Sequence, residues 1–277
     1  MANHYDEPEV QEWPRDAKVD EAKEALMAEL FEKRHEVFYG RQIAVFFERR
    51  FYHWITTKAL NELADEGRVR SVTEALIGSA EGEMIRFYWS KRTRYFRRQM
   101  QEIQKLVHEF STPGMLRALG LHGEAMFDVG LARFGWSEKA RHARLFQGKE
   151  WTQTGHNLDR ISERDGVEYG VEVKNALSYI DRIELIAKIE MCKFLSLRPL
   201  FIMRMAPTNY IELVRAAGGF TLVFEWQLYP YGQEQLAQRV RERLGLKVDC
   251  PQGISDGTMQ RLLNWHLKQL GEDVNSL

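Results

Sequence analysis

Three charged residues near the middle of the chain have types and spacing that could bind a cation. Asp159, Glu172 and Lys174 flank an Asp165-Gly166 pair that joins two alternating runs, the strongest short-range signal for a β-hairpin. With this pair as the loop, Asp159 lies opposite Glu172, and Lys174 shares the face of Glu172 because strand side chains alternate. Opposed carboxylates repel each other, so the hairpin is either an ordinary exposed charged surface or a cation site.

The elements around this hairpin must place it in a larger sheet. Upstream, Glu124 falls in the first turn of a helix predicted over about 123–134, where the helix dipole by itself favours an acid. Downstream, apolar spacing predicts a helix over about 180–195 and a buried strand over 199–205. Further helices and strands follow towards the C-terminus. This order predicts an α/β fold in which helices flank a central mixed β-sheet.

The combination of these residues resembles the PD-(D/E)xK nuclease superfamily, which has a restriction-endonuclease-like fold also found in Holliday-junction resolvases. The similarity covers about residues 114–206, and Leu158 departs from the proline of the family pattern. It depends on an early helical acid, a hairpin aspartate and a Glu-x-Lys triplet, followed by a helix and a strand: Glu124, Asp159, Glu172, Val173 and Lys174.

The resemblance implies Mg²⁺-dependent hydrolysis of DNA phosphodiester bonds, with Mn²⁺ as a substitute. Hard divalent cations take oxygen ligands, which Asp159, Glu172 and the Val173 carbonyl would supply. Lys174 would position the attacking water, and Glu124 would bind a second ion directly or through water. In such a site a metal acidifies water and stabilises charge on the phosphoryl oxygens.

Three more residues are candidates for supporting roles. Lys188 falls on the polar side of the helix after the hairpin, and Arg204 alternates with two methionines and could reach a phosphate. His156 is a candidate for a structural or DNA contact. Each also has an ordinary interpretation, as a solvated or structural side chain.

The first third of the chain resembles a winged helix-turn-helix domain over roughly residues 20–90. Helices are expected over about 17–36, 41–50 and 55–66, with Asp16 as the first cap, and two extended runs follow. The third helix would present four residues to DNA, unless this is only a solvated helix face: Thr56, Thr57, Lys58 and Asn61.

A basic segment follows these strands. Between Arg86 and Lys105 there are seven Lys or Arg residues and one acid, Glu102. Such a local excess can neutralise phosphates even when the net charge is near zero; the alternative is a solvated helix with a half-buried aromatic stripe. The residues expected to bind nucleic acid here are Lys91, Arg92, Arg94, Arg97 and Arg98.

Composition sets the remaining bounds. The chain has 277 residues, a net charge of −1 and two distant cysteines, which suits a reduced, cytoplasmic protein without a disulfide framework. We expect an N-terminal arm (1–16), a winged-helix domain (17–92), a linker helix (93–113) bounded by Thr112-Pro113-Gly114, and a nuclease domain with a C-terminal helical extension (114–277).

The predicted activity is that of a metal-dependent DNA endonuclease acting on duplex or branched DNA. A homodimer is expected, because cutting two strands needs two active sites. The main alternative is a non-enzymatic winged-helix regulator with a degenerate nuclease-like domain, and a winged-helix adaptor for other proteins is a third option.

Overall fold

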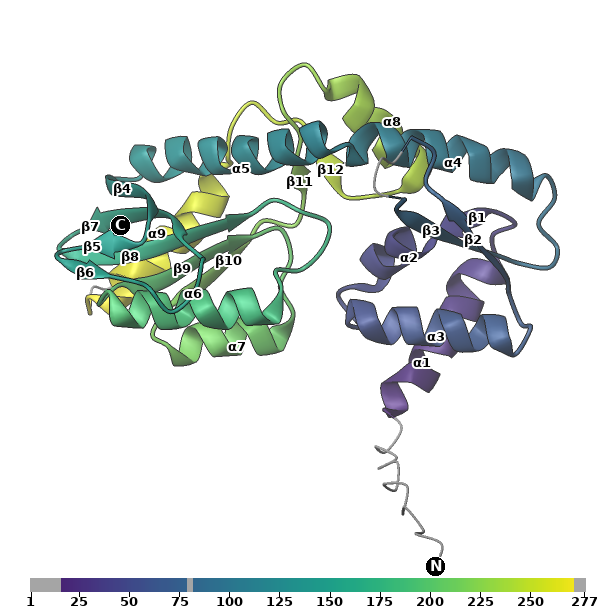
Figure 1. Ribbon diagram of the computed structural model, residues 1–277, viewed down its shortest axis with the longest axis horizontal. Helices are drawn as coiled ribbons and strands as arrows, with labels where there is room; N and C mark the ends of the chain where they lie inside the picture. The colour runs from purple at the N-terminus through teal and green to yellow at the C-terminus, as the bar shows by residue number, and fades with distance from the viewer. Residues whose placement is uncertain (1–15, 79–81, 272–277) are drawn as a thin grey trace, which may run out of the picture. The chain divides into compact units, whose positions relative to one another are not determined.

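The computed structural model describes residues 16–78 and 82–271, which divide into two compact units (Figure 1). Met1–Glu74 and Met84–Met100 belong to the first unit, and Ala75–Glu83 and Gln101–Leu277 belong to the second. Nearly all of the expected N-terminal arm lies outside the described residues. Asp16 does cap the first helix, as expected, because its carboxylate accepts the N–H of Lys18 at 2.9 Å.

The first unit combines short helices with a three-stranded sheet in the order β1-β3-β2. The helical run expected over 17–36 is shorter and ends in a π-helical turn, and a short strand absent from the prediction follows it. The elements are α1 (Ala17–Leu26), η1 (Met27–Phe31), β1 (Val37–Tyr39), α2 (Gly40–Phe47), α3 (His53–Asp65), β2 (Arg70–Ala75) and β3 (Met84–Trp89).

The boundary between the units falls inside α4 (Phe96–Ser111), within the range expected for the linker helix (93–113). The first turn of this helix packs with the strands of the first unit. The ring of Phe96 stacks on Trp89 with centroids 5.0 Å apart, and the Gln99 side chain accepts the N–H of Val37 at 2.9 Å. The predicted linker helix is therefore partly built into the first unit.

The second unit is an α/β structure with a mixed five-stranded sheet, as predicted. The strand order is β10-β9-β8-β7-β4, with β8, β9 and β10 parallel and β7 antiparallel to both neighbours. Its elements are α5 (Pro113–Arg133), β4 (Ser137–Ala143), β5 (Leu145–Phe146), β6 (Lys149–Glu150), β7 (Leu158–Arg164), β8 (Val167–Lys174), α6 (Arg182–Phe194), β9 (Arg198–Met203), α7 (Thr208–Ala216), β10 (Phe220–Val223), β11 (Gln227–Leu228), α8 (Glu234–Leu244), β12 (Val248–Asp249) and α9 (Asp256–Gln269).

Helices cover both faces of this sheet (Figure 1). On one face, Phe127 of α5 and Leu262 of α9 belong to the same apolar cluster as Val171 of the sheet. On the other face, α6 and α7 pack against β9 through Leu185 and Val214. Both sheet faces are buried, as is usual where parallel strands predominate.

Helix α5 is longer than the sequence indicated, which changes the position of Glu124. The Thr112-Pro113-Gly114 stretch begins this helix instead of marking a break: Thr112 Oγ1 accepts the N–H of Met115 at 3.2 Å and proline occupies the first turn. Glu124 therefore lies in the middle of a 21-residue helix. The helix dipole, which acts within the first turn, does not explain an acid there.

Within the described ranges, no helix is long and apolar enough to cross a membrane.

Candidate active site

The hairpin of β7 and β8 has the predicted two-residue turn and register. Asp165 and Gly166 both have positive φ angles, 51° and 75°, as a type I′ turn requires. Cα partners run outward from the turn as far as Arg160 and Val171. The pairing inferred from the Asp-Gly signal is thus confirmed over this part of the hairpin.

Asp159 and Glu172 follow directly beyond the last of these pairs. Instead of extending the ladder, the Asp159 carboxylate accepts the backbone N–H of Val173 at 2.7 Å. The Glu172 side chain is only 4% exposed. The two acids therefore lie side by side where the strands separate.

The ionisation of three acids reflects this arrangement. Burial, with the Asp159 carboxylate beside it, raises the pKa of Glu172 to about 8. Burial also raises the pKa of Asp159, against the opposing effects of Lys188 and the Val173 N–H. Burial and the Asp159 charge raise the pKa of Glu124 as well, so α5 does bring this residue to the predicted site. Three carboxyl groups share one region and resist being charged together.

Lys188 lies inside the site and not on a solvated helix face. Its ammonium is 2.5 Å from Glu172 Oε2 and 3.3 Å from Glu184 Oε1, and the residue is 5% exposed. Burial alone lowers the pKa of Lys188, but the surrounding carboxylates outweigh this and raise it. Lys188 is thus a buried cation that partly compensates the acidic cluster.

Lys174 approaches the same group from the end of β8. It is half-buried, and its ammonium is 3.8 Å from Glu184 Oε2. Glu184 was not among the predicted site residues. Its position four residues before Lys188 on α6 is the spacing at which helical acids and lysines pair, and this spacing could have indicated it.

His142 is a second site residue that the sequence did not reveal. The β4–β7 register pairs Arg141 with Arg160 and Ala143 with Leu158, which puts His142 opposite Asp159. Its proximity contributes to lowering the pKa of Asp159. The backbone of His142 has a φ of 44°, a left-handed conformation uncommon for residues other than glycine. No sequence motif predicts that His142 lies near Asp159, because this position depends on the bulge in β4.

The prediction that Arg204 reaches a phosphate is wrong. Arg204 is 1% exposed, and its guanidinium donates to the carbonyls of Ala176 and Leu177 at 2.8 and 3.0 Å. It ties the loop after β8 to the end of β9. His156 also has a local contact, since its Nδ1 lies 3.0 Å from Thr154 Oγ1.

The residues predicted to read DNA from α3 are only partly available. Thr56 is fully buried and continues the apolar stripe of the helix, which corrects the prediction that it faces outward. Asn61 is half-buried, and its Oδ1 accepts hydrogen bonds from Arg86 at 2.8 Å and from Tyr88 at 2.9 Å. Thr57 and Lys58 are exposed, although the Thr57 hydroxyl donates to the His53 carbonyl.

The five Lys and Arg residues expected to bind nucleic acid in the basic segment are all exposed, while Thr93 between them is buried. The exposed residues are Lys91, Arg92, Arg94, Arg97 and Arg98.

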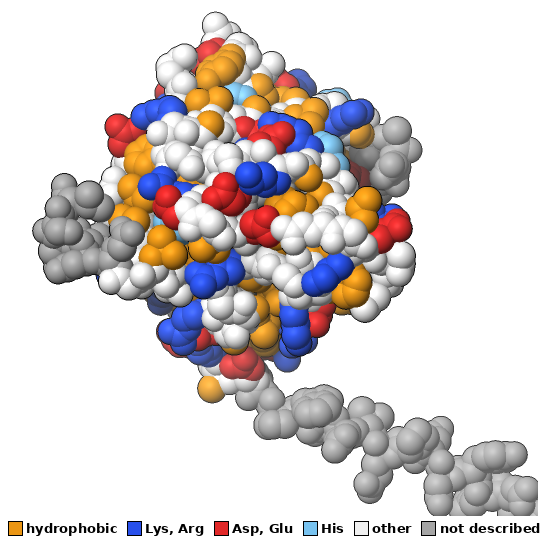
Figure 2. Space-filling model, turned by 90° about the vertical axis from the view of Figure 1, so that its left-hand side faces the viewer, with side chains coloured by type: hydrophobic (Ala, Val, Ile, Leu, Met, Phe, Trp, Pro, Cys, Tyr) orange, Lys and Arg blue, Asp and Glu red, His pale blue; other side chains and the backbone are white. Residues whose placement is uncertain are grey.

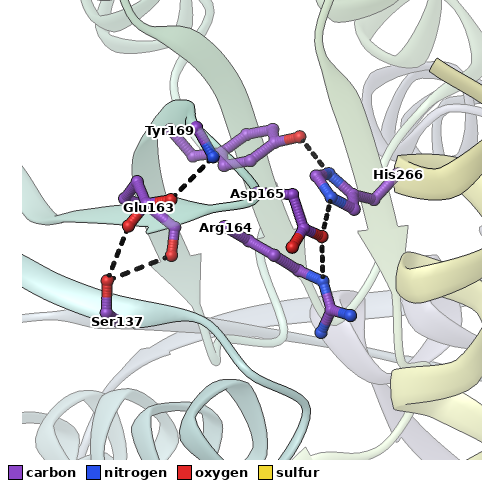
Figure 3. A network of polar contacts seen from close by, with 7 residues as sticks. Ser137, Glu163, Arg164, Asp165, Tyr169 and His266 are labelled. Carbon is purple, nitrogen blue, oxygen red and sulfur yellow. Dashed lines mark hydrogen bonds and ion pairs between the residues drawn. The ribbon is translucent and has the colours of Figure 1, made fainter. Parts of the chain in front are cut away.

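A polar network anchors the hairpin turn to the last described helix (Figure 3). His266 on α9 is fully buried; its Nε2 lies 2.9 Å from Asp165 Oδ2 and its Nδ1 lies 2.6 Å from the Tyr169 hydroxyl. The hydrogen bond with His266 lowers the pKa of Asp165, and burial raises the pKa of Tyr169 to about 12. Arg164 also bonds to Asp165 at 2.9 Å. The turn that sets the register is therefore held from outside the hairpin.

Over the described residues, the face shown in Figure 2 carries no large patch of one charge that would indicate a functional site. On the face shown in Figure 2, acidic, basic and apolar side chains are interspersed. Among the residues that the structure describes, no group of three or more His, Cys, Asp or Glu side chains is arranged to hold a metal ion. Comparison of the chain with protein-family models, curated proteins and solved structures gave no match. The functional argument therefore depends on the geometry described above.

Proposed function

We propose that the protein is a metal-dependent DNA endonuclease with an Asp-Glu-x-Lys active site. One observation carries the proposal: Asp159 and Glu172 lie together where β7 and β8 separate, and Glu124 of α5 is close enough for the Asp159 charge to raise its pKa. Lys174 reaches this cluster through Glu184, which contacts both Lys174 and Lys188. Surface charges that meet by chance are seldom this buried, and a buried acid pair with raised pKa values is the kind of cluster found at functional sites.

The donor set fits a hard divalent cation. Asp159, Glu172, the Val173 carbonyl and Glu124 would provide oxygen ligands, which Mg²⁺ and Mn²⁺ accept. In the described structure Glu172 Oε2 is buried and makes no well-directed hydrogen bond, although the Lys188 ammonium lies 2.5 Å away. A bound cation would supply stabilisation of negative charge on a phosphoryl group and acidification of a water.

The protein's own residues have separate roles in this proposal. Lys174 is less buried than Lys188, so it can reach a phosphate or orient a water. Lys188 of α6 holds the Glu172 side chain in place through its 2.5 Å contact with Oε2. Glu184 contacts both lysines and so sets their spacing.

The first unit supports binding of DNA. Its element order, α1, β1, α2, α3, β2 and β3, with the sheet order β1-β3-β2, is consistent with a winged helix-turn-helix. Thr57 and Lys58 on α3 and the basic segment remain its candidates for DNA contact. We propose that these groups bind the phosphate backbone, and that a homodimer supplies the second active site for the other strand.

The test is cleavage of plasmid and branched DNA by the purified chain, with Mg²⁺ and with EDTA. Wild type should cut only with metal, and Lys174→Ala should abolish cutting. Lys193→Ala, which removes an equally charged but exposed lysine of the next helix, should cut like wild type. Equal cleavage by wild type and Lys174→Ala would refute the proposed site.

One observation favours the second candidate, a DNA-binding regulator without nuclease activity. The Lys188 ammonium occupies the space beside Glu172 Oε2 that a metal would need. If the protein binds DNA but never cuts it, and neither Mg²⁺ nor Mn²⁺ shifts its thermal midpoint, this candidate replaces the first.

A further inference from the structure

The loop that joins β3 to α4 forms an open, basic depression on the first unit. We call residues 91–95 the basic loop. Lys91, Arg92 and Arg94 line the depression together with Thr93 and Tyr95. Among the described residues that line it, none is an acid. A concave surface with several cations and no carboxylate attracts a polyanion.

Tyr95 projects from this loop into solvent. It is 81% exposed, and its φ of 54° lies in the left-handed region, which is unfavourable for a bulky side chain. The conformation is enforced by the start of α4, because the Tyr95 carbonyl accepts the N–H groups of Arg98 and Gln99 at 3.1 and 3.2 Å. Outliers of this kind concentrate at ligand-binding sites.

Hydrogen bonds to its backbone also fix the conformation of the basic loop. Gln99 donates to the Arg94 carbonyl at 3.1 Å while accepting the Val37 N–H at 2.9 Å. The Thr93 N–H donates to the Ser90 carbonyl at 2.9 Å. The cations and the tyrosine ring are therefore held by a preformed backbone, which reduces the entropy lost on binding.

Thr93 provides an independent indication of a ligand. It is 8% exposed and lines the depression, yet its Oγ1 has no hydrogen-bond partner in the part of the chain that the structure describes. It lies just before the N-terminus of α4, a helix of 16 residues. Helix N-termini favour anions, and the hydroxyl, which is itself buried, would gain a hydrogen-bond partner if a bound phosphate made the Thr93 side chain turn towards the depression.

We propose that the basic loop binds an unpaired nucleotide of DNA. Its phosphate would lie against Lys91, Arg92, Arg94 and Thr93, and its base would stack on Tyr95. Inside a duplex both faces of a base are covered by its neighbours, so away from the duplex ends an exposed ring stacks on a base that has left the helix. The substrate class is therefore DNA with a single-stranded segment, such as an overhang, gap or branch point.

This inference deepens the proposed function and rests on it, because it narrows the DNA that the nuclease would recognise. It is tested by binding and not by cleavage. Fluorescence anisotropy in EDTA compares a blunt duplex with the same duplex carrying a single-stranded tail.

Wild type should bind the tailed DNA more tightly than the blunt duplex. Tyr95→Gly removes the ring and suits the positive φ, so the variant should fold at least as stably as wild type. It should lose about tenfold in affinity for the tailed DNA and little for the blunt duplex. Tyr95→Phe should retain the preference, and Tyr231→Ala, which removes another exposed tyrosine, should match wild type.

The inference is overturned if Tyr95→Gly keeps the wild-type preference for tails, if it weakens both DNAs equally, or if wild type has no such preference. The endonuclease proposal is judged separately, by Lys174-dependent cleavage in Mg²⁺. A chain that cuts plasmid but ignores the tail would refute the nucleotide site alone.

Discussion

Replacing Glu172 by glutamine should make the metal-free protein more stable at alkaline pH. Glu172 is buried beside Asp159, and its pKa is raised from 4.5 to about 8. The folded protein thus holds this proton more tightly than the unfolded chain. The resulting stability is fully present below pH 4.5 and is lost as the pH rises through about 8.

The magnitude follows from the size of this pKa difference. At about 1.4 kcal/mol for each tenfold change, the wild type should lose roughly 4–5 kcal/mol from this residue between about pH 4 and pH 9. Glutamine resembles the protonated acid and does not titrate. We therefore expect similar stabilities for the two proteins near pH 4, an advantage of about 2 kcal/mol for Glu172→Gln near pH 6, and an advantage of several kcal/mol near pH 9.

Urea denaturation in EDTA at a series of pH values measures this difference. Mg²⁺ should narrow the difference at pH 9, because a ligand that binds only the folded state stabilises it by about 2.7 kcal/mol at a hundredfold excess over Kd, and the variant lacks the ligand carboxylate. Metal affinity of the wild type should rise with pH, since binding displaces the Glu172 proton.

The reasoning fails if Glu172→Gln is strongly destabilised at pH 6. That result would mean that Glu172 is ionised there and forms a full ion pair with Lys188, in which case removal of one partner costs about 3–5 kcal/mol.

Three further substitutions test how the site is held, each by urea denaturation. Gly170→Ala places a methyl group 2.5 Å from Cys192 Sγ and should lower the free energy of unfolding by about 1–3 kcal/mol. The control Gly155→Ala has open space around the new methyl group and should lower it by less than about 0.5 kcal/mol. Equal effects of the two substitutions would contradict the close packing at Gly170. His266→Ala leaves the buried Tyr169 hydroxyl without its hydrogen-bond partner and should lower the free energy of unfolding by about 2–4 kcal/mol. An unchanged free energy would show that the network does not stabilise the fold. Asn175→Ala removes three buried hydrogen bonds to backbone groups and should lower the free energy of unfolding by about 3 kcal/mol. A decrease below about 1 kcal/mol would contradict a stabilising role for these hydrogen bonds.

The hairpin could be predicted from the sequence because its determinants are local. Asp165-Gly166 accepts two positive φ angles in succession, and a two-residue turn fixes the register of both strands. The approach of Asp159 to Glu172 follows from that register. The separation of the strands at Asp159 does not, because it depends on the hydrogen bond from Val173.

The errors arise where tertiary contacts overrule local chemistry. Thr56 is polar, but it continues the buried stripe that includes Leu60 and Leu63. Arg204 is charged, but backbone carbonyls satisfy it inside the protein. The Thr112-Pro113-Gly114 stretch predicts a boundary, yet α5 begins there and packs so closely at Gly123 that a Cβ would lie 2.6 Å from Asn175 Cβ. Such close approaches appear only in three dimensions.

The anchoring of the hairpin turn by α9 has a consequence for synthesis of the protein. The strands carrying Asp159 and Glu172 leave the ribosome well before His266, which lies 101 residues after its partner Asp165. At about 5–20 residues per second, roughly 5–20 s pass between synthesis of the hairpin turn and synthesis of the helix that anchors it. A nascent chain therefore completes the anchoring of this hairpin only after α9 has been synthesised.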